Sequence, residues 1–290
     1  LGATVMDWID NNNAKFYHHG KHGVDYYNHQ TLTRKEKYPF DNKGVYKKNV
    51  DSLKSNGYTI FKNVISHDLI DSILDKASYC IKTKQNLKSH DNHYSAINQP
   101  YLQSDECFQL ATSDLLFNVA TEYFDCIPAL GTCNLRRSYV NSLPPTTTQL
   151  FHCDKNAIKF FKFFIYLNDV ETPEDGPLTL VRGSLQKRPY NHGIKHRWSE
   201  EEIKNLYGQD SLIYLTAKKG DLIAATTTAY HRGTKPTSKE RTMFTVNYVT
   251  HPELAGGRPG QHEKFFSIKQ EQHDSLPDHK KPLTDFLIKV

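Results

Sequence analysis

The sequence predicts a mainly β protein, an antiparallel sandwich or barrel, with helices flanking its N-terminal side. From about Leu130 onward, short runs rich in β-branched and aromatic residues alternate with clusters of Pro, Gly and Asp. Most of these runs follow one another without a helical segment between them, which favours antiparallel pairing over a parallel sheet. Upstream of this region, apolar residues recur at helical spacing in two segments, which predicts the flanking helices.

The chain before Leu130 divides into an arm and an ordered segment. Residues 1–50 are rich in Asn, His, Lys and Tyr and show little periodicity, so we expect an irregular N-terminal arm or lid. Residues 51–57 predict a short helical piece and a turn, and residues 58–64 predict a strand. Two helices are expected next, the first capped by Ser66 and the second beginning after Ser113.

The strand-rich region supplies the runs that we expect to form the β core. They cover residues 134–141, 159–169, 177–184, 211–217, 220–230 and 241–250. In the run at 159–169, alternation places Phe161, Phe163 and Ile165 on one face and Lys162, Phe164 and Tyr166 on the other. Residues 251–290 are expected to form a C-terminal tail packed on the core, with a short helix at 283–290. The main domain therefore spans residues 51–250.

Composition excludes several classes of protein. No apolar run reaches the roughly 18 residues that a membrane span needs. The five cysteines are scattered without a C-x-x-C pair, which argues against a zinc ribbon and a disulfide scaffold and predicts reduced thiols in a cytoplasmic protein. Lys and Arg exceed Asp and Glu by five but form no block, so we expect no nucleic-acid partner, and a mild preference for an anionic substrate.

A histidine and an aspartate stand just before the aromatic strand at 159–169. Residues two apart in a strand project to the same side, so His152 and Asp154 can bind one ion while Cys153 points away. Two histidines and a carboxylate are the ligand set of non-haem Fe(II) sites. Composition alone gives roughly 1.7 such His-x-acid pairs by chance. The chain has two, the other being His251 and Glu253, so the pair is not diagnostic by itself.

A second segment supplies the missing ligand. His231 lies at the end of a predicted strand, and Arg241 opens the next strand ten residues later. Arginine binds carboxylates with two parallel hydrogen bonds. Such a side chain is suited to hold the distal carboxylate of 2-oxoglutarate while the keto-acid end of that molecule chelates iron.

These segments together resemble the phytanoyl-CoA dioxygenase family of Fe(II)- and 2-oxoglutarate-dependent oxygenases. The resemblance covers residues 51–250 and includes the entry pattern "LKSNGYTIFKNVISHDLIDSIL", the H-x-D motif, and the strand and turn "FFIYLNDVETPEDGPLTLVRGSLQK". It ends with His231 and Arg241. It implies a double-stranded β-helix, the jelly-roll core of cupin-like proteins.

The resemblance also implies residue roles. His152, Asp154 and His231 would bind Fe(II), and the co-substrate 2-oxoglutarate would contact Arg241, Gln149 and Thr228. The family often carries a hydroxyl two residues after the distal histidine, where this chain has Gly233. Related halogenases replace the carboxylate ligand by a small residue, so Asp154 favours hydroxylation.

Substrate contacts are expected from two strands. Asn134 and Arg136 share a face of one strand, and Thr245 and Asn247 share the face of Arg241 on another. Arg136 could equally be a surface ion-pairing residue beside Arg137, and the residues of the second strand could equally be hydrogen-bonded core residues.

The predicted activity is hydroxylation of a C–H bond of a small, polar or anionic molecule, with O2 consumed and succinate and CO2 released. The alternatives are a cupin-like metal-binding isomerase and a ligand-binding jelly-roll without oxygenase activity. Arg241 discriminates against both, since neither needs a carboxylate clamp behind the metal. The sequence leaves open the substrate and the oligomeric state.

Overall fold

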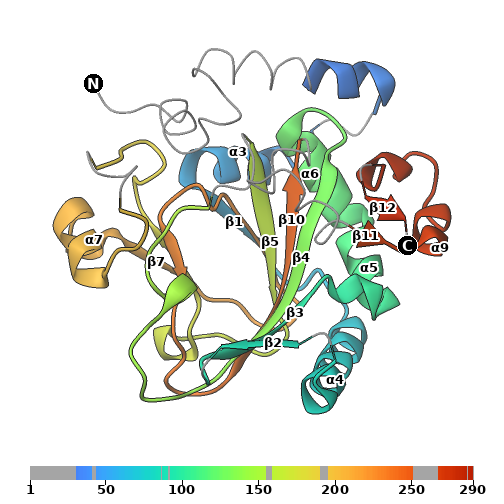
Figure 1. The fold of residues 1–290 in the computed structure, drawn as a ribbon. Helices are drawn as coiled ribbons and strands as arrows, with labels where there is room; N and C mark the ends of the chain where they lie inside the picture. The colour runs from blue at the N-terminus through green and yellow to red at the C-terminus, as the bar shows by residue number, and fades with distance from the viewer. Residues whose placement is uncertain are drawn as a thin grey trace.

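The computed structural model describes residues 31–40, 44–85, 87–90, 92–154, 159–189, 195–250, 267–285 and 287–289. A large sheet runs in the order β1-β8-β5-β10-β4-β3-β2, with every neighbouring pair antiparallel, and a smaller antiparallel sheet runs β7-β6-β9. Figure 1 shows β7 and α7 on one side of the large sheet and α4, α5 and α6 on the other. This is the mainly β jelly-roll architecture that the sequence predicted.

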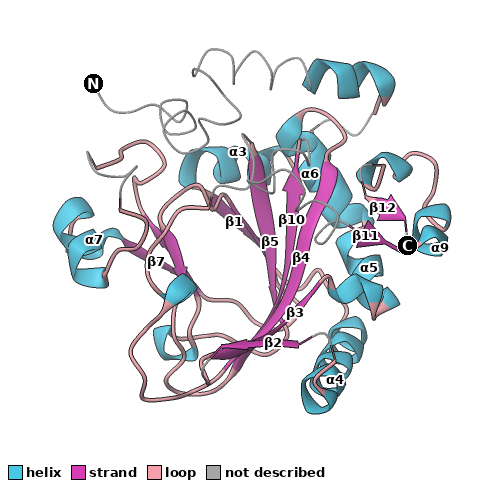
Figure 2. Cartoon of the chain, viewed as in Figure 1, coloured by secondary structure: helices cyan, strands magenta, loops and turns pink. Residues whose placement is uncertain are grey.

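The strands of the two sheets have the following bounds: β1 Tyr58–Phe61, β2 Leu87–His90, β3 Tyr94–Asn98, β4 Ala129–Ser138, β5 Phe160–Tyr166, β6 Leu178–Val181, β7 Leu212–Leu215, β8 Leu222–Ala225, β9 His231–Gly233 and β10 Arg241–Val249. The helices are α3 Lys47–Asn56, α4 His67–Thr83, α5 Asp105–Ala111, α6 Asp114–Phe124, α7 Glu200–Tyr207 and α9 Gln270–Asp274. Figure 2 shows how the helices flank the strands.

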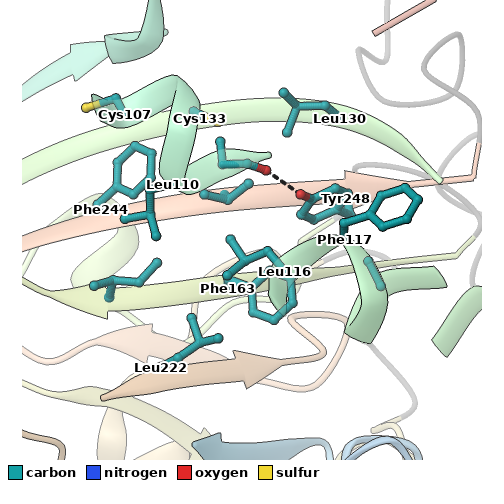
Figure 3. Packing of buried hydrophobic residues seen from close by; sticks show 14 of the residues in the cluster. Cys107, Leu110, Leu116, Phe117, Leu130, Cys133, Phe163, Leu222, Phe244 and Tyr248 are labelled. Atoms are coloured by element: carbon teal, nitrogen blue, oxygen red, sulfur yellow. Dashed lines mark hydrogen bonds between the residues drawn. The ribbon is translucent and has the colours of Figure 1, made fainter. Parts of the chain in front are cut away.

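The main hydrophobic core lies between the large sheet and the helices. Phe161, Phe163 and Ile165 of β5 all point into this cluster, where they meet buried residues of α4 and α6. Figure 3 shows Phe163 packed near Leu116 of α6, and Tyr248 of β10 donating its hydroxyl hydrogen to the carbonyl of Ala111. The alternation predicted for β5 is therefore confirmed.

The opposite face of the same strands forms the interior of the jelly-roll. Phe164 and Tyr166 belong to a second buried cluster with residues of the smaller sheet, including Leu178 and Leu180. Lys162, on the same face, is mostly buried as well. A strand with one face toward helices and the other toward a second sheet needs apolar residues on both faces, which explains its continuous aromatic run.

The two predicted helices form where they were expected. Ser66 and Ser113 occupy the N-cap positions of α4 and α6, although neither side chain caps the helix by a hydrogen bond. The first strand is shorter than predicted, because β1 ends at Phe61. Asn63 then adopts a left-handed conformation, and the amides of Val64 and Ile65 both donate to the carbonyl of Gly220, so the chain turns toward α4 instead of extending the strand.

The terminal segments differ from the prediction. Residues 31–37 of the expected irregular arm are helical, and the Arg34 guanidinium donates to the carbonyls of Ile127, Pro128 and Pro282 at 2.6, 3.0 and 3.0 Å. The short helix predicted at 283–290 is wrong. Residues Lys281–Leu283 form one 3-10 turn, and Ile288–Lys289 pairs in parallel with Ser267–Ile268, because that register gives the last backbone groups strand partners.

Two further predictions concern cysteine and membranes. The five cysteines all lie among the described residues, none of them forms a disulfide, and four of them are buried. Among the described residues, none of the helices has the length and apolar character that crossing a bilayer requires.

Candidate metal and co-substrate site

Backbone pairing brings the two halves of the H-x-D…H motif together. The amides of His152 and His231 each donate to the other residue's carbonyl, both at 2.9 Å, in an isolated antiparallel bridge. The amide of Asp154 donates to the carbonyl of Thr227 at 2.9 Å. Two segments that are distant in sequence are thereby fixed side by side at the end of the jelly-roll strands.

The two imidazoles are oriented by backbone carbonyls. Nδ1 of His152 lies 2.9 Å from the carbonyl of Leu150, and Nδ1 of His231 lies 3.0 Å from that of Ala229. A carbonyl can only accept, so each Nδ1 carries the proton and each Nε2 presents a lone pair. These Nε2 atoms lie 3.6 and 3.4 Å from the Asp154 carboxylate oxygens, and one ligand atom from each of the three residues lies within 4.8 Å of the other two.

The protonation states suit a cation. Burial and the neighbouring His231 lower the pKa of His152 to about 3, so its imidazole is neutral at physiological pH. Burial alone would raise the pKa of Asp154, but the ammonium of Lys162, 2.6 Å away, outweighs it and holds that pKa well below its ordinary value. Two imidazoles and an ionised carboxylate form the donor set that Fe(II) accepts, with one face of the ion left open. Among the described residues this is the group of side chains able to hold a metal.

Arg241 lies in the same cavity, buried at the start of β10. Its Nη2 donates to Oγ of Ser138 at 3.0 Å, and its Nη1 donates to the carbonyl of Gly176. Burial lowers the Arg241 pKa to about 10, which leaves the guanidinium charged at neutral pH. Gly176 has a φ of +77°, and a Cβ there would come within 2.7 Å of the carbonyl of Thr234, so the turn that orients this carbonyl requires glycine.

The cavity around these groups has a volume of about 160 Å³, roughly the share of five water molecules. It contains the three candidate metal ligands, Arg241, and three of the predicted substrate residues. Its described lining is Thr132, Asn134, Arg136, Thr148, His152, Asp154, Lys162, Phe164, Leu178, His231, Gly233, Arg241, Met243 and Thr245. A larger hollow of about 660 Å³, between α5 and the C-terminal segment, is remote from these residues.

Three predicted site residues lie outside the described lining of the cavity. Gln149 is buried, but its side chain accepts from the amide of Thr146 at 3.2 Å and caps a 3-10 turn. The carbonyl of Thr228 accepts from Arg188. Asn247 is fully buried against Gly131, where a Cβ would approach its Nδ2 to 2.9 Å. Glu253, from the second His-x-acid pair, lies with His251 outside the described residues.

Sequence reasoning missed several lining residues, among them Thr148 and Lys162. Thr148 lies beside the predicted Gln149 and accepts a hydrogen bond from Arg136, and Lys162 shares the face of Phe164. The alternation of β5 already placed Lys162 inside the jelly-roll, and a lysine at an inward position was the signal that could have identified it.

Comparison with known proteins identifies the fold. No family model matches the chain, and no curated protein matches it in sequence. Solved structures do match. The non-haem alpha-ketoglutarate-dependent epimerase SnoN from nogalamycin biosynthesis has a TM-score of 0.58 at 15% identity, covering 70% of this chain and 82% of that one. The corresponding carbocyclase SnoK has a TM-score of 0.56 at 15% identity, covering 70% and 83%.

HygX from Streptomyces hygroscopicus, with nickel and 2-oxoglutarate bound, is also similar, with a TM-score of 0.55 at 13% identity over 71% of this chain and 87% of that one. At such low identity the likeness establishes the architecture. The chain therefore has the double-stranded β-helix fold that the sequence predicted, with its His-Asp-His cluster inside.

Proposed function

We propose that the protein is an Fe(II)- and 2-oxoglutarate-dependent oxygenase acting on a small molecule. The observation that carries this proposal is the presence, in one cavity, of a His-Asp-His ligand set and a buried guanidinium. Similar structures support it, since HygX was solved with nickel and 2-oxoglutarate, and SnoN with Fe3+ and alpha-ketoglutarate.

The chain's own residues would divide the work as follows. His152, Asp154 and His231 would hold the metal. Arg241 binds the distal carboxylate of 2-oxoglutarate, and the Ser138 hydroxyl and Gly176 carbonyl keep its guanidinium in place. When bound, iron and 2-oxoglutarate together with O2 supply the oxidising power, and succinate and CO2 are released. The buried walls exclude bulk water from the reacting bond.

For the outcome of the reaction we propose hydroxylation of a C–H bond. Asp154 fills the third ligand position, which leaves no place on the metal for the halide that a halogenase needs. The architecture alone does not set the outcome, because SnoK is a carbocyclase and SnoN an epimerase. HygX was solved with hygromycin B bound, and SnoN in complex with nogalamycin RO, which supports a small-molecule substrate here as well.

A jelly-roll isomerase or a ligand-binding module is the alternative. Neither needs a charged guanidinium buried behind the metal ligands, and burying that charge without a partner anion is costly. We also propose that the oxygenase domain spans residues 51–250.

The test is anaerobic addition of Fe(II) and 2-oxoglutarate. The expected result is a visible metal-to-ligand charge-transfer band, lost in His152→Ala and requiring far more 2-oxoglutarate in Arg241→Ala. Arg137→Gln is the matched control, because Arg137 lies on the neighbouring strand β4, outside the described lining of the cavity, and donates to Ser78 and Thr242. A wild-type protein that gives no band, and no succinate when O2 is admitted, would rule out the oxygenase.

A further inference from the structure

The cavity carries more positive charge than the proposed cofactors need. Its described lining has three cationic side chains, Arg136, Lys162 and Arg241, and one carboxylate, Asp154. The net charge of these four groups is therefore +2, with the imidazoles counted as neutral metal ligands. A ferrous ion and a 2-oxoglutarate dianion cancel each other, so the loaded site would keep the same surplus. A buried surplus of this size is costly unless a further anion enters.

Two of the three cations already have assigned partners. Lys162 forms an ion pair with Asp154 at 2.6 Å, and Arg241 is assigned to the distal carboxylate of 2-oxoglutarate. Arg136 has no carboxylate partner among the described residues. Its guanidinium stacks over the ring of Tyr94, 4.2 Å from the centroid, and Nη1 donates to Oγ1 of Thr148 at 2.8 Å.

The donors of Arg136 remain largely unused. A guanidinium has five N–H donors. In the described part of the chain one hydrogen bond from this group is formed, and Nε is buried without an acceptor. The flat face is taken by Tyr94 and one edge by Thr148, which fixes the guanidinium while leaving N–H groups for a ligand in the cavity. Two parallel N–H groups match a carboxylate or a phosphate.

Arg137, the next residue of β4, has a structural role instead. Arg137 donates from Nε to Thr242 Oγ1 at 3.1 Å and from Nη2 to Ser78 Oγ at 2.9 Å, on the helix side of the sheet. Arg136 instead lines the cavity that contains the metal ligands. Burial lowers its pKa, against smaller raising effects of Tyr94 and then of Asp154.

We propose that Arg136 binds an anionic group, a carboxylate or a phosphate, of the primary substrate, and so sets the substrate class. This inference rests on the proposed function, since it assigns Arg241 and the metal to 2-oxoglutarate. Because Arg136 lines the same cavity as the metal ligands, an anionic group bound to it places the neighbouring carbon near the metal. The bond that reacts is therefore close to the anionic group of the substrate.

The experiment titrates small probes into the anaerobic complex of the protein with Fe(II) and saturating 2-oxoglutarate, followed by calorimetry. The probes are acetate, methyl phosphate and acetamide, the last being the neutral analogue of acetate in shape. We expect acetate or methyl phosphate to bind and acetamide not to bind, and the stronger of the two anions identifies the group. Arg136→Gln should weaken that anion about tenfold or more, the range of charge-assisted hydrogen bonds.

Two further variants keep the test decisive. Arg137→Gln should bind the anion like the wild type, and Arg136→Lys, which keeps the charge but not the fork, should bind several-fold more weakly. The charge-transfer band is recorded in every sample. A normal band, together with anion binding that is the same in the wild type and in Arg136→Gln, overturns this inference but not the proposed function. The same holds if the band weakens in Arg136→Gln while anion binding persists. A wild-type protein without the band overturns the proposed function, and this inference with it.

Discussion

Replacing Gly233 by serine should strengthen the binding of 2-oxoglutarate. The resembling family often carries a hydroxyl at this position, and here the site has only hydrogen. The backbone of Gly233 is not left-handed, so it accepts a side chain without strain. A Cβ there would lie 3.4 Å from Nη2 of Arg241, 3.8 Å from Nη1 and 3.9 Å from the carbonyl of Thr148, which are ordinary contacts. The new hydroxyl would therefore stand beside the guanidinium that we assign to the distal carboxylate.

The hydroxyl of Gly233→Ser should change the affinity for 2-oxoglutarate, whereas the added Cβ should change the stability of the protein. A hydrogen bond from a hydroxyl to a charged carboxylate contributes about 1.5 kcal/mol net, which is about tenfold in the dissociation constant. Gly233→Ala supplies the methyl group without the hydroxyl and is the matched control. It should raise the free energy of unfolding by about 0.4–1 kcal/mol, because it restricts the unfolded chain at a position the folded backbone tolerates.

The assay is an anaerobic titration of 2-oxoglutarate followed by the charge-transfer band, with thermal unfolding of each variant recorded alongside. The comparison that matters is serine against alanine, since both add the same Cβ. If serine binds 2-oxoglutarate no more tightly than alanine, the distal carboxylate does not lie beside Arg241 as we infer. If alanine destabilises the protein, the space next to the guanidinium is smaller than its contacts indicate.

Three further predictions follow from other parts of the structure. Arg241→Lys should weaken 2-oxoglutarate about tenfold or more, because an ammonium cannot replace the two-pronged contact; unchanged affinity in the same titration would contradict this. Burial raises the Asp175 pKa, but Ser238 and the amides of Glu171 and Thr172 outweigh it and lower that pKa to about 2. Asp175→Asn should therefore lower the free energy of unfolding, measured with urea at pH 7, by up to about 2 kcal/mol. This loss should fade as the pH falls from 3.8, the pKa in the unfolded chain, toward 2, the pKa in the folded protein. A loss at pH 2 equal to that at pH 7 would refute the prediction. Phe163→Ala should lower the free energy of unfolding by about 3–5 kcal/mol, since Phe163 is fully buried, and a loss below 1 kcal/mol would mean the core collapses around the gap.

Much of the site could be predicted because strand periodicity is local. A two-residue repeat fixes which side chains share a face, so Asn134 with Arg136, and Phe161 with Phe163, were assigned without knowing what lay opposite. The same rule does not apply where the chain leaves a strand. Gln149, which was assigned from the family resemblance, sits in a 3-10 turn, where its side chain accepts from the Thr146 amide, and its neighbour Thr148 lines the cavity.

The sequence by itself determined the β-rich core, the two flanking helices, and the His152-x-Asp154 pair on one side of its segment. Only the tertiary structure decided that His231 meets that pair, through reciprocal backbone hydrogen bonds with His152. It also decided that Lys162 forms an ion pair with Asp154, while Arg136 keeps N–H donors without acceptors in the described part of the chain. Local patterns are set by covalent geometry over a few residues. The partners of a side chain depend on the register of strands far apart in the sequence, and that register is settled by the packing of the whole sheet.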